Sequence, residues 1–88
     1  MPWRVASVEP LPDYRLHVRF LDGLEGVVDM AALIASPEAG VFAALRDIAV
    51  FNQAFVRLGA VSWPGDLDIA PDAIHAAITA SADRQCLL

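Results

Sequence analysis

The densest group of side chains that could do chemistry lies in an acidic segment, residues 62–72. Its carboxylates, Asp66, Asp68 and Asp72, could supply oxygen ligands to a hard divalent cation, and Trp63 could form the floor of a ligand pocket. An EF-hand loop would need further oxygen ligands, a central glycine and a distal glutamate, which the segment lacks. Turn and helix-cap chemistry also explains these residue types, with the acids solubilising a turn and the indole anchoring it to the core. We favour this structural interpretation and keep as candidates for binding a partner or ligand Trp63, Asp66, Asp68, Asp72 and His75.

The other nucleophiles, bases and metal ligands form no catalytic or metal-binding pattern. His17 lies on the polar face of a predicted strand and His75 lies off the apolar stripe of a predicted helix, so we expect both imidazoles to be exposed. Together with Cys86 they lack the short pairwise spacing of a structural zinc site. No serine lies in a nucleophile-elbow sequence, and the glycines match neither a dinucleotide-binding fingerprint nor a P-loop. The sequence therefore predicts no catalytic residue, no metal and no cofactor.

The composition is that of a folded domain with more apolar side chains than its size can bury. Hydrophobic residues make up 57% of the 88 residues and charged residues 19%, which is far from the composition of a disordered chain. This length predicts a single domain over residues 1–88. Because a domain of this size has little interior, we expect an exposed apolar patch that a second copy covers, making the protein a homodimer.

The charge distribution disfavours nucleic acid and membrane surfaces as partners. The net charge is -5, and the chain has no run of cationic residues. Such a run is what releases counterions from a phosphate backbone or binds anionic lipids. A small basic protein is the partner that this charge would attract. The single cysteine excludes an intramolecular disulfide, and no stretch resembles a signal peptide or a membrane span, so we expect a cytoplasmic protein.

Alternation of apolar and polar residues predicts the strands of the N-terminal half. Residues 14–20 alternate as a strand with one buried face, Asp22-Gly23 suits a tight turn, and residues 25–29 return as the partner strand. Residues 3–8 predict a further strand, joined to the first through a proline-rich connection. These three strands are expected to form an antiparallel meander.

The rest of the chain predicts helices and short strands. Cap signals followed by apolar residues at helical spacing predict helices at residues 29–34, 38–46 and 71–82. Short strands are predicted at residues 55–58, 60–63 and 67–69, and residues 83–88 are expected to fray. The predicted fold class is therefore α+β, a small antiparallel sheet of the meander plus short later strands, covered by two or three helices. The predicted core comprises Leu16, Val18, Phe20, Val27, Phe42, Leu45, Phe51, Ile74 and Ile78.

An ordered series of signatures spans most of the chain, from Trp3 to Ile78. The series comprises residues 14–23, Asp29-Met30, the segment from Phe42 to Asp47, Phe51, Trp63-Pro64 and residues 68–72. It resembles the bacterial family called domain of unknown function 2442. The resemblance implies a small α+β domain, often encoded beside another small protein in an arrangement like a toxin–antitoxin pair. It supplies no catalytic residues.

These features predict a protein-binding or accessory module, antitoxin-like toward the product of a neighbouring gene, rather than an enzyme. Two surfaces could serve, either an unpaired strand edge or the segment from Trp63 to Asp72. The alternative is a small-molecule or divalent-cation-binding protein, or an enzyme, that uses the same segment from Trp63 to Asp72.

Overall fold

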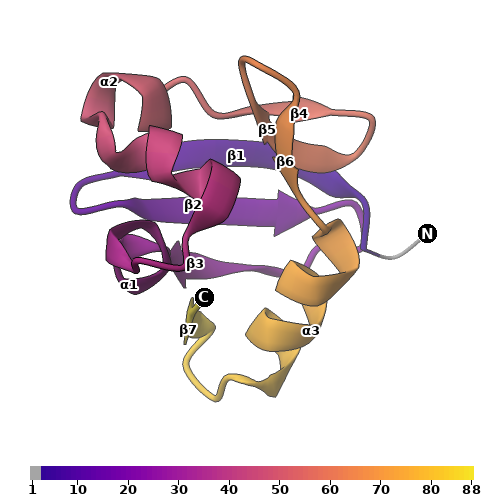
Figure 1. Ribbon diagram of the computed structural model, residues 1–88. Coiled ribbons are helices and arrows are strands. Elements are labelled where there is room, and N and C mark those ends of the chain that lie inside the picture. Colours follow the sequence, from indigo (N-terminus) through magenta and orange to yellow (C-terminus); the bar gives the residue numbers. More distant parts are fainter. Residues whose placement is uncertain (1–2) are drawn as a thin grey trace.

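The first three strands form the antiparallel meander that the alternating sequence predicts. The computed structural model describes residues 3–88. The strands lie side by side in sequence order (Figure 1) and are β1 (Val5–Leu11), β2 (Arg15–Phe20) and β3 (Glu25–Asp29). On β2, Leu16, Val18 and Phe20 are buried. The polar residues between them face the opposite side of the sheet, since successive side chains of a strand alternate.

The buried valine of β3 is Val28, so the prediction of Val27 as a core residue is wrong. In the antiparallel ladder Leu16 pairs with Val28 and His17 pairs with Val27. Because cross-strand partners point to the same face, Val28 faces the core with Leu16, and Val27 faces outward with His17. Two adjacent valines fit either register, and only the pairing with β2 decides between them.

Three short helical segments follow β3. They are α1 (Ala31–Ala35), the 3-10 helix η1 (Gly40–Arg46) and α2 (Ile48–Phe51). Asp29, the predicted cap, accepts the backbone N–H two residues ahead at 2.9 Å at the entry to α1. Asp47 makes the same contact at 3.0 Å at the start of α2, a helix that was not predicted. The helix predicted over residues 38–46 is shorter, because Gly40 takes a positive φ of 59° and the chain then winds as a 3-10 helix.

A second antiparallel sheet is formed by the short strands predicted in this region. Its strands, in spatial order, are β4 (Phe55–Arg57), β5 (Ala60–Trp63) and β6 (Leu67–Ile69). The backbone N–H of Val5 donates to the Gly59 carbonyl at 2.8 Å and so joins β1 to the connection between β4 and β5. Helix α3 (Pro71–Ala80) follows, with proline in its first turn and Ile74 and Ile78 buried on one face.

The C-terminal residues 83–88 do not simply fray, contrary to the prediction. Residues Gln85–Leu87 form strand β7, which pairs in parallel with β3. The Ser81 hydroxyl donates to the Gln85 carbonyl at 2.5 Å and accepts the Gln85 N–H at 3.2 Å. A parallel pair with a distant strand leaves no local signal in the sequence, which is why the strand was not predicted. Both backbone groups of Gln85 are satisfied within the chain.

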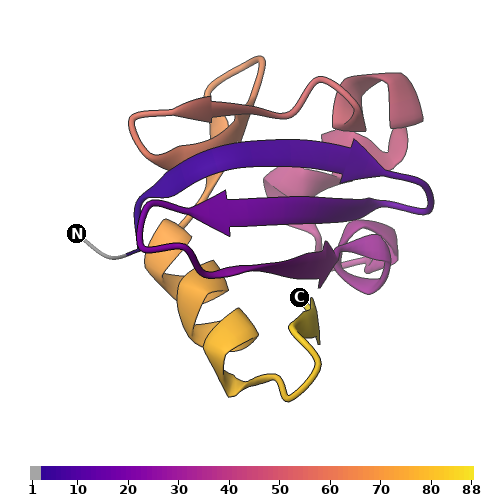
Figure 2. The same cartoon turned by 180° about the vertical axis from the view of Figure 1, so that it is seen from behind.

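The core lies between one face of the four-stranded sheet and the helices with the second sheet. Figure 1 shows the helices on the near side, and Figure 2 shows β1, β2 and β3 uncovered from behind. Most predicted core residues are fully buried, whereas Phe42 is partly buried and packs against them. The members of the buried hydrophobic cluster that were not predicted are Val5, Val28, Met30, Ile34, Val61 and Trp63. The α+β prediction is confirmed by the mixed four-stranded sheet, the second three-stranded sheet and the short helices.

Candidate functional site

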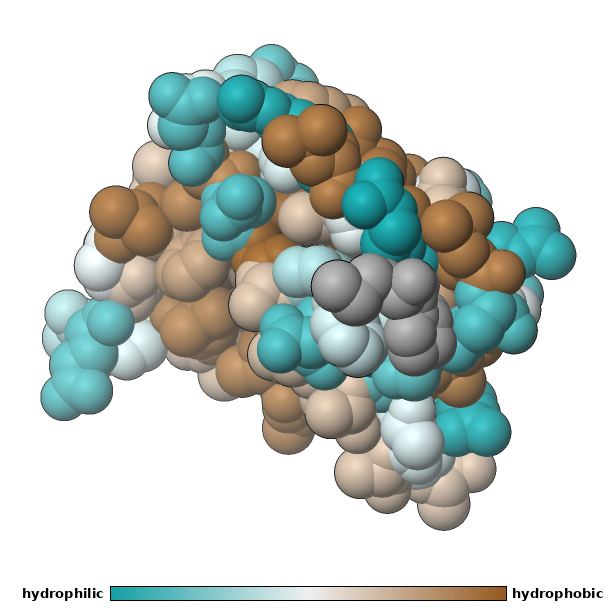
Figure 3. Space-filling view, turned by 90° about the vertical axis from the view of Figure 1, so that its right-hand side faces the viewer, coloured by the Kyte–Doolittle hydropathy of each residue, from teal (hydrophilic) through white to brown (hydrophobic). Residues whose placement is uncertain are grey.

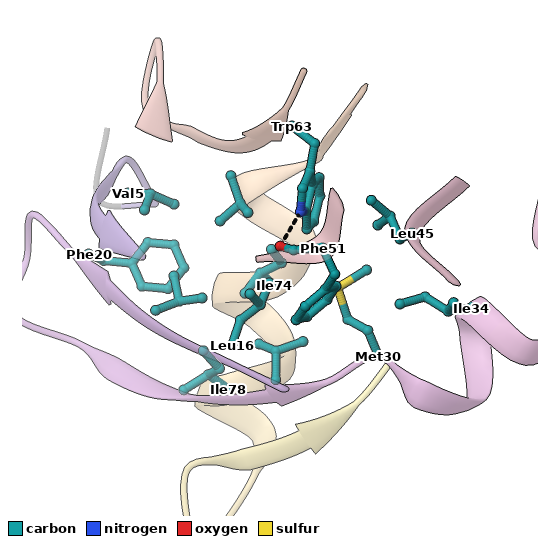
Figure 4. Packing of buried hydrophobic residues seen from close by; sticks show 13 residues of the cluster. Val5, Leu16, Phe20, Met30, Ile34, Leu45, Phe51, Trp63, Ile74 and Ile78 are labelled. Carbon is teal, nitrogen blue, oxygen red and sulfur yellow. Dashed lines mark hydrogen bonds between the residues drawn. The ribbon is translucent and has the colours of Figure 1, made fainter. Parts of the chain in front are cut away.

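Trp63 lies in the core rather than on the surface of the acidic segment. Its side chain is only 1% exposed. The indole Nε1–H donates to the Phe51 carbonyl oxygen at 2.9 Å (Figure 4), which satisfies the one polar atom of the ring and joins β5 to α2. Trp63 therefore anchors the segment, as the structural interpretation predicts, and its indole is not available to a partner.

The turn between β5 and β6 directs one carboxylate into solvent. Gly65 and Asp66 take positive φ angles of 92° and 61°, which glycine and aspartate adopt more readily than most residues. The Asp66 side chain is 88% exposed, and its Oδ1 pairs with the Arg57 guanidinium at 2.9 Å. An ion pair this exposed stabilises the fold by less than about 1 kcal/mol, so it leaves Asp66 available to another cation.

Asp68 and Asp72 are exposed at separate places beside this turn. Asp68 lies on β6 opposite Ser62, and Asp72 lies in the first turn of α3, where its charge is favourable near the positive end of the helix dipole. Within residues 3–88, no group of three His, Cys, Asp or Glu side chains is placed to hold a metal ion. The structure thus does not bring Asp66, Asp68 and Asp72 together as the ligand set that the cation alternative needs.

Two surface hollows meet at Asp66. The first, of about 280 Å³, is called here the Val41 hollow and is lined by Val41, Ala44, Pro64, Gly65, Asp66 and Leu67. The second, of about 530 Å³, is called here the Arg57 hollow and is lined by Arg57, Leu58, Ala60, Asp66, Asp68 and Pro71. Asp66 therefore forms a ridge between an apolar hollow and a charged one.

Several residues that shape these hollows were not predicted as site residues. Val41 has the helical spacing of a core residue, yet it is 71% exposed at the rim of the first hollow. Arg57 and Leu58 come from the β4–β5 hairpin and reach the acidic segment only through the pairing of β4, β5 and β6. The Leu58-Gly59 pair between two short strands is the one sequence signal that could have indicated an exposed apolar turn.

His75 lies away from both hollows and is less exposed than predicted. Its side chain is 21% exposed, and its Nε2 lies 2.8 Å from Asp22 Oδ2 in the turn between β2 and β3. The imidazole also meets the Phe20 ring edge to face, with centroids 4.8 Å apart. His75 therefore joins α3 to the meander, a contact between residues too distant in sequence for spacing to reveal.

We expect the Asp22–His75 contact to make the free energy of unfolding depend on pH in the acidic range. The hydrogen bond from His75, with a second from the Leu24 amide, holds the pKa of Asp22 below its ordinary value of 3.8. A carboxyl group whose pKa is lower in the folded state stabilises that state fully above pH 3.8, and the stabilisation is lost as the pH falls from there through the folded pKa. The free energy of unfolding of the wild type should therefore exceed that of Asp22→Asn at pH 5. The two free energies should converge as the pH falls below 3.8 and passes the folded pKa of Asp22.

An NMR titration of the Asp22 carboxyl carbon measures this effect directly. His75→Phe keeps an aromatic ring against Phe20 but removes the hydrogen bond, so the pKa of Asp22 should rise toward 3.8. An unchanged Asp22 pKa in His75→Phe would contradict the contact.

A two-sheet α+β domain with an exposed acidic turn is the class of protein that the fold and the site define. One family model, described as Protein of unknown function (DUF2442), matches residues 5–80. The chain belongs to this family. No curated protein and no solved structure matched the chain. Among residues 3–88, none of the helices has the length and apolar composition that a bilayer crossing requires.

Proposed function

We propose that the protein is a protein-binding module with an accessory, antitoxin-like role, and that its partner is a small basic protein. The partner would bind at the Val41 hollow, with its apolar side chains against Val41 and Leu67 and its cationic side chains on the acidic ridge at Asp66. In this proposal Trp63 acts indirectly, because it fixes the turn that carries Asp66 to the core.

The observation that supports this function best is an exposed apolar side chain beside a carboxylate ridge. Val41 is 71% exposed although Leu45 in the same helix, η1, is fully buried, so the monomer does not use the Val41 side chain for packing. Apolar residues surrounded by polar ones are the usual arrangement of a protein interface, in which the apolar centre contributes most of the binding energy. The Val41 hollow has this arrangement on a small scale.

The charge of the chain supports a basic partner. The net charge is -5, and Asp66, Asp68 and Asp72 are all exposed around the turn. Opposite charges on the partner would speed the encounter, and apolar contacts in the hollow would slow dissociation. A small basic protein encoded by a neighbouring gene would meet these requirements in an antitoxin-like pair, and both proteins would be expected in the cytoplasm.

Capture of the neighbouring gene product by the tagged protein tests the proposal. We expect Val41→Lys to weaken binding at least about tenfold, because it replaces an apolar contact by a charge that repels a basic partner. Leu87→Lys is the matched control, since Leu87 is 73% exposed and lies on β7, away from the hollow. Binding should also weaken as salt is raised.

Two results would overturn either this function or the surface assigned to it. One is a wild-type protein that binds no stoichiometric partner when isolated from its native cell. The other is a partner that Val41→Lys retains as strongly as Leu87→Lys does, which would place the interface elsewhere.

A further inference from the structure

The tip of the β4–β5 hairpin carries a leucine that the monomer does not need. Leu58 and Gly59 form a two-residue turn with positive φ angles of 53° and 78°, as in a type I′ turn, where asparagine, aspartate and glycine are preferred. The Leu58 side chain is 84% exposed. Neither the turn geometry nor core packing therefore accounts for leucine at this position, and such a local exception is a reason to look for a function.

The Arg57 hollow opens beside this leucine on the outer face of the second sheet. Val56 is paired with the buried Val61, so alternation along β4 turns Arg57 to the outer face. On the same face, β5 contributes the small side chain of Ala60, and β6 contributes Asp68. A projecting apolar side chain and a hollow thus lie next to each other on one surface.

The Arg57 hollow also carries both signs of charge. Arg57, Asp66 and Asp68 all line it, and the Arg57 guanidinium pairs with Asp66 Oδ1 at 2.9 Å within the chain. This ion pair is exposed and therefore weak, so Arg57 can also face a second carboxylate. Figure 3 faces the side of the molecule where the β4–β5 connection lies, and hydrophobic residues there are interspersed with hydrophilic ones. A twofold axis brings each part of a surface against a different part of the same surface, so a surface with a projection, a hollow and opposite charges can be its own complement.

We propose that the occupant of this surface is a second copy of the chain. Leu58 of each copy enters the Arg57 hollow of the other, and the Arg57 guanidinium of each copy faces the Asp68 carboxylate of the other. A second copy is favoured over a basic partner because this surface already carries the cation, Arg57, that its carboxylates would attract. The chain has only six Lys and Arg residues, so a cation at this place is notable. This hollow shares only Asp66 with the Val41 hollow, and the dimer contacts named here do not use Asp66, so the inference does not rest on the proposed function.

Light scattering on the purified chain from micromolar to sub-millimolar concentration tests the dimer. The wild type should approach twice the 9.4 kDa of one chain. Leu58→Asn should raise the dimer dissociation constant at least about tenfold, and asparagine suits the positive φ, so its monomer should melt no lower than the wild type. Leu87→Asn, an equally apolar and 73% exposed position on β7, should leave the dimer intact.

An exchange of charges identifies the two surfaces that meet. Arg57→Asp and Asp68→Arg should each be monomeric, because each variant brings like charges together at the twofold interface. An equimolar mixture of the two should form a heterodimer, in which every opposed pair again has opposite charges. A monomeric wild type, a dimer that survives Leu58→Asn, or a mixture that fails to associate would each overturn the inference.

Discussion

Replacing Trp63 by alanine is expected to lower the free energy of unfolding by about 3–5 kcal/mol, the usual range for truncating a buried tryptophan. The Trp63 side chain is 1% exposed and is among the largest buried side chains of the core. It also contacts α2, because its indole donates to the Phe51 carbonyl and lies beside the Phe51 ring. Since the whole free energy of unfolding of a small domain is only about 5–15 kcal/mol, this loss is a large fraction of the stability of the protein.

Urea unfolding followed by circular dichroism measures this loss, and Trp63→Phe separates its causes. Phenylalanine keeps an aromatic ring but removes the indole N–H, so that the Phe51 carbonyl keeps only the Ala54 N–H at 3.3 Å, and the lost hydrogen bond costs about 0.5–1.5 kcal/mol. Trp3→Phe is the control, because Trp3 is only partly buried. If Trp63→Ala were no less stable than Trp3→Phe, the anchoring role would be wrong. Because Trp63 is buried, a loss of partner binding in Trp63→Ala would reflect unfolding and not a lost contact. The exposed Val41 is therefore the position at which the interface is tested.

The parts of the fold that could be predicted are those with a local signal. The alternation along residues 14–20 gives the buried face of β2, because a strand has a period of two. Proline in the first turn of α3, followed by Ile74 and Ile78 one turn apart, gives the start and the buried face of that helix. In each case the residues of one short segment are enough to predict both the type of element and the face that it buries.

The features that could not be predicted depend on contacts between distant segments. The choice between Val27 and Val28 is made by β2, since adjacent valines have no alternation of their own. Strand β7 exists because β3 offers it an edge, and nothing in Gln85–Leu87 alone marks a parallel strand. Local patterns therefore predicted most elements of this chain, but not β7 and not every pairing between strands.

The candidate site divides in the same way. The exposure of Asp66, Asp68 and Asp72 follows from turn and helix-cap chemistry, which is local. The burial of Trp63 depends on α2, and the contact of His75 depends on Asp22, which lies 53 residues away. The Val41 hollow could not be foreseen, because it joins η1 to the β5–β6 turn. A sequence pattern here identified a surface with its chemistry, and the fold decided which of its side chains face outward.

Replacing Gly26 by alanine is expected to separate β7 and α3 from β3 and to lower the free energy of unfolding by about 1–3 kcal/mol, as overpacking of a core does. A β-carbon at this buried position would lie 2.5 Å from the Arg84 carbonyl oxygen and 2.8 Å from Ile78 Cγ2. The Ile78 side chain can rotate, but the Arg84 carbonyl belongs to the backbone and already accepts the Val27 N–H at 2.8 Å. The added methyl group must therefore displace the start of β7.

Amide hydrogen exchange locates the displacement within the chain. Protection should fall first at the Val27 amide, and at the Leu88 amide, which donates to the Asp29 carbonyl at 3.0 Å beside the end of β7. Gly23→Ala is the control, because a β-carbon there meets no atom within 4 Å and only the strain of its positive φ remains. That variant should lose stability without selective exchange at Val27 and Leu88. If these two amides were equally protected in Gly26→Ala and in the wild type, the place of β7 would not depend on having glycine at position 26.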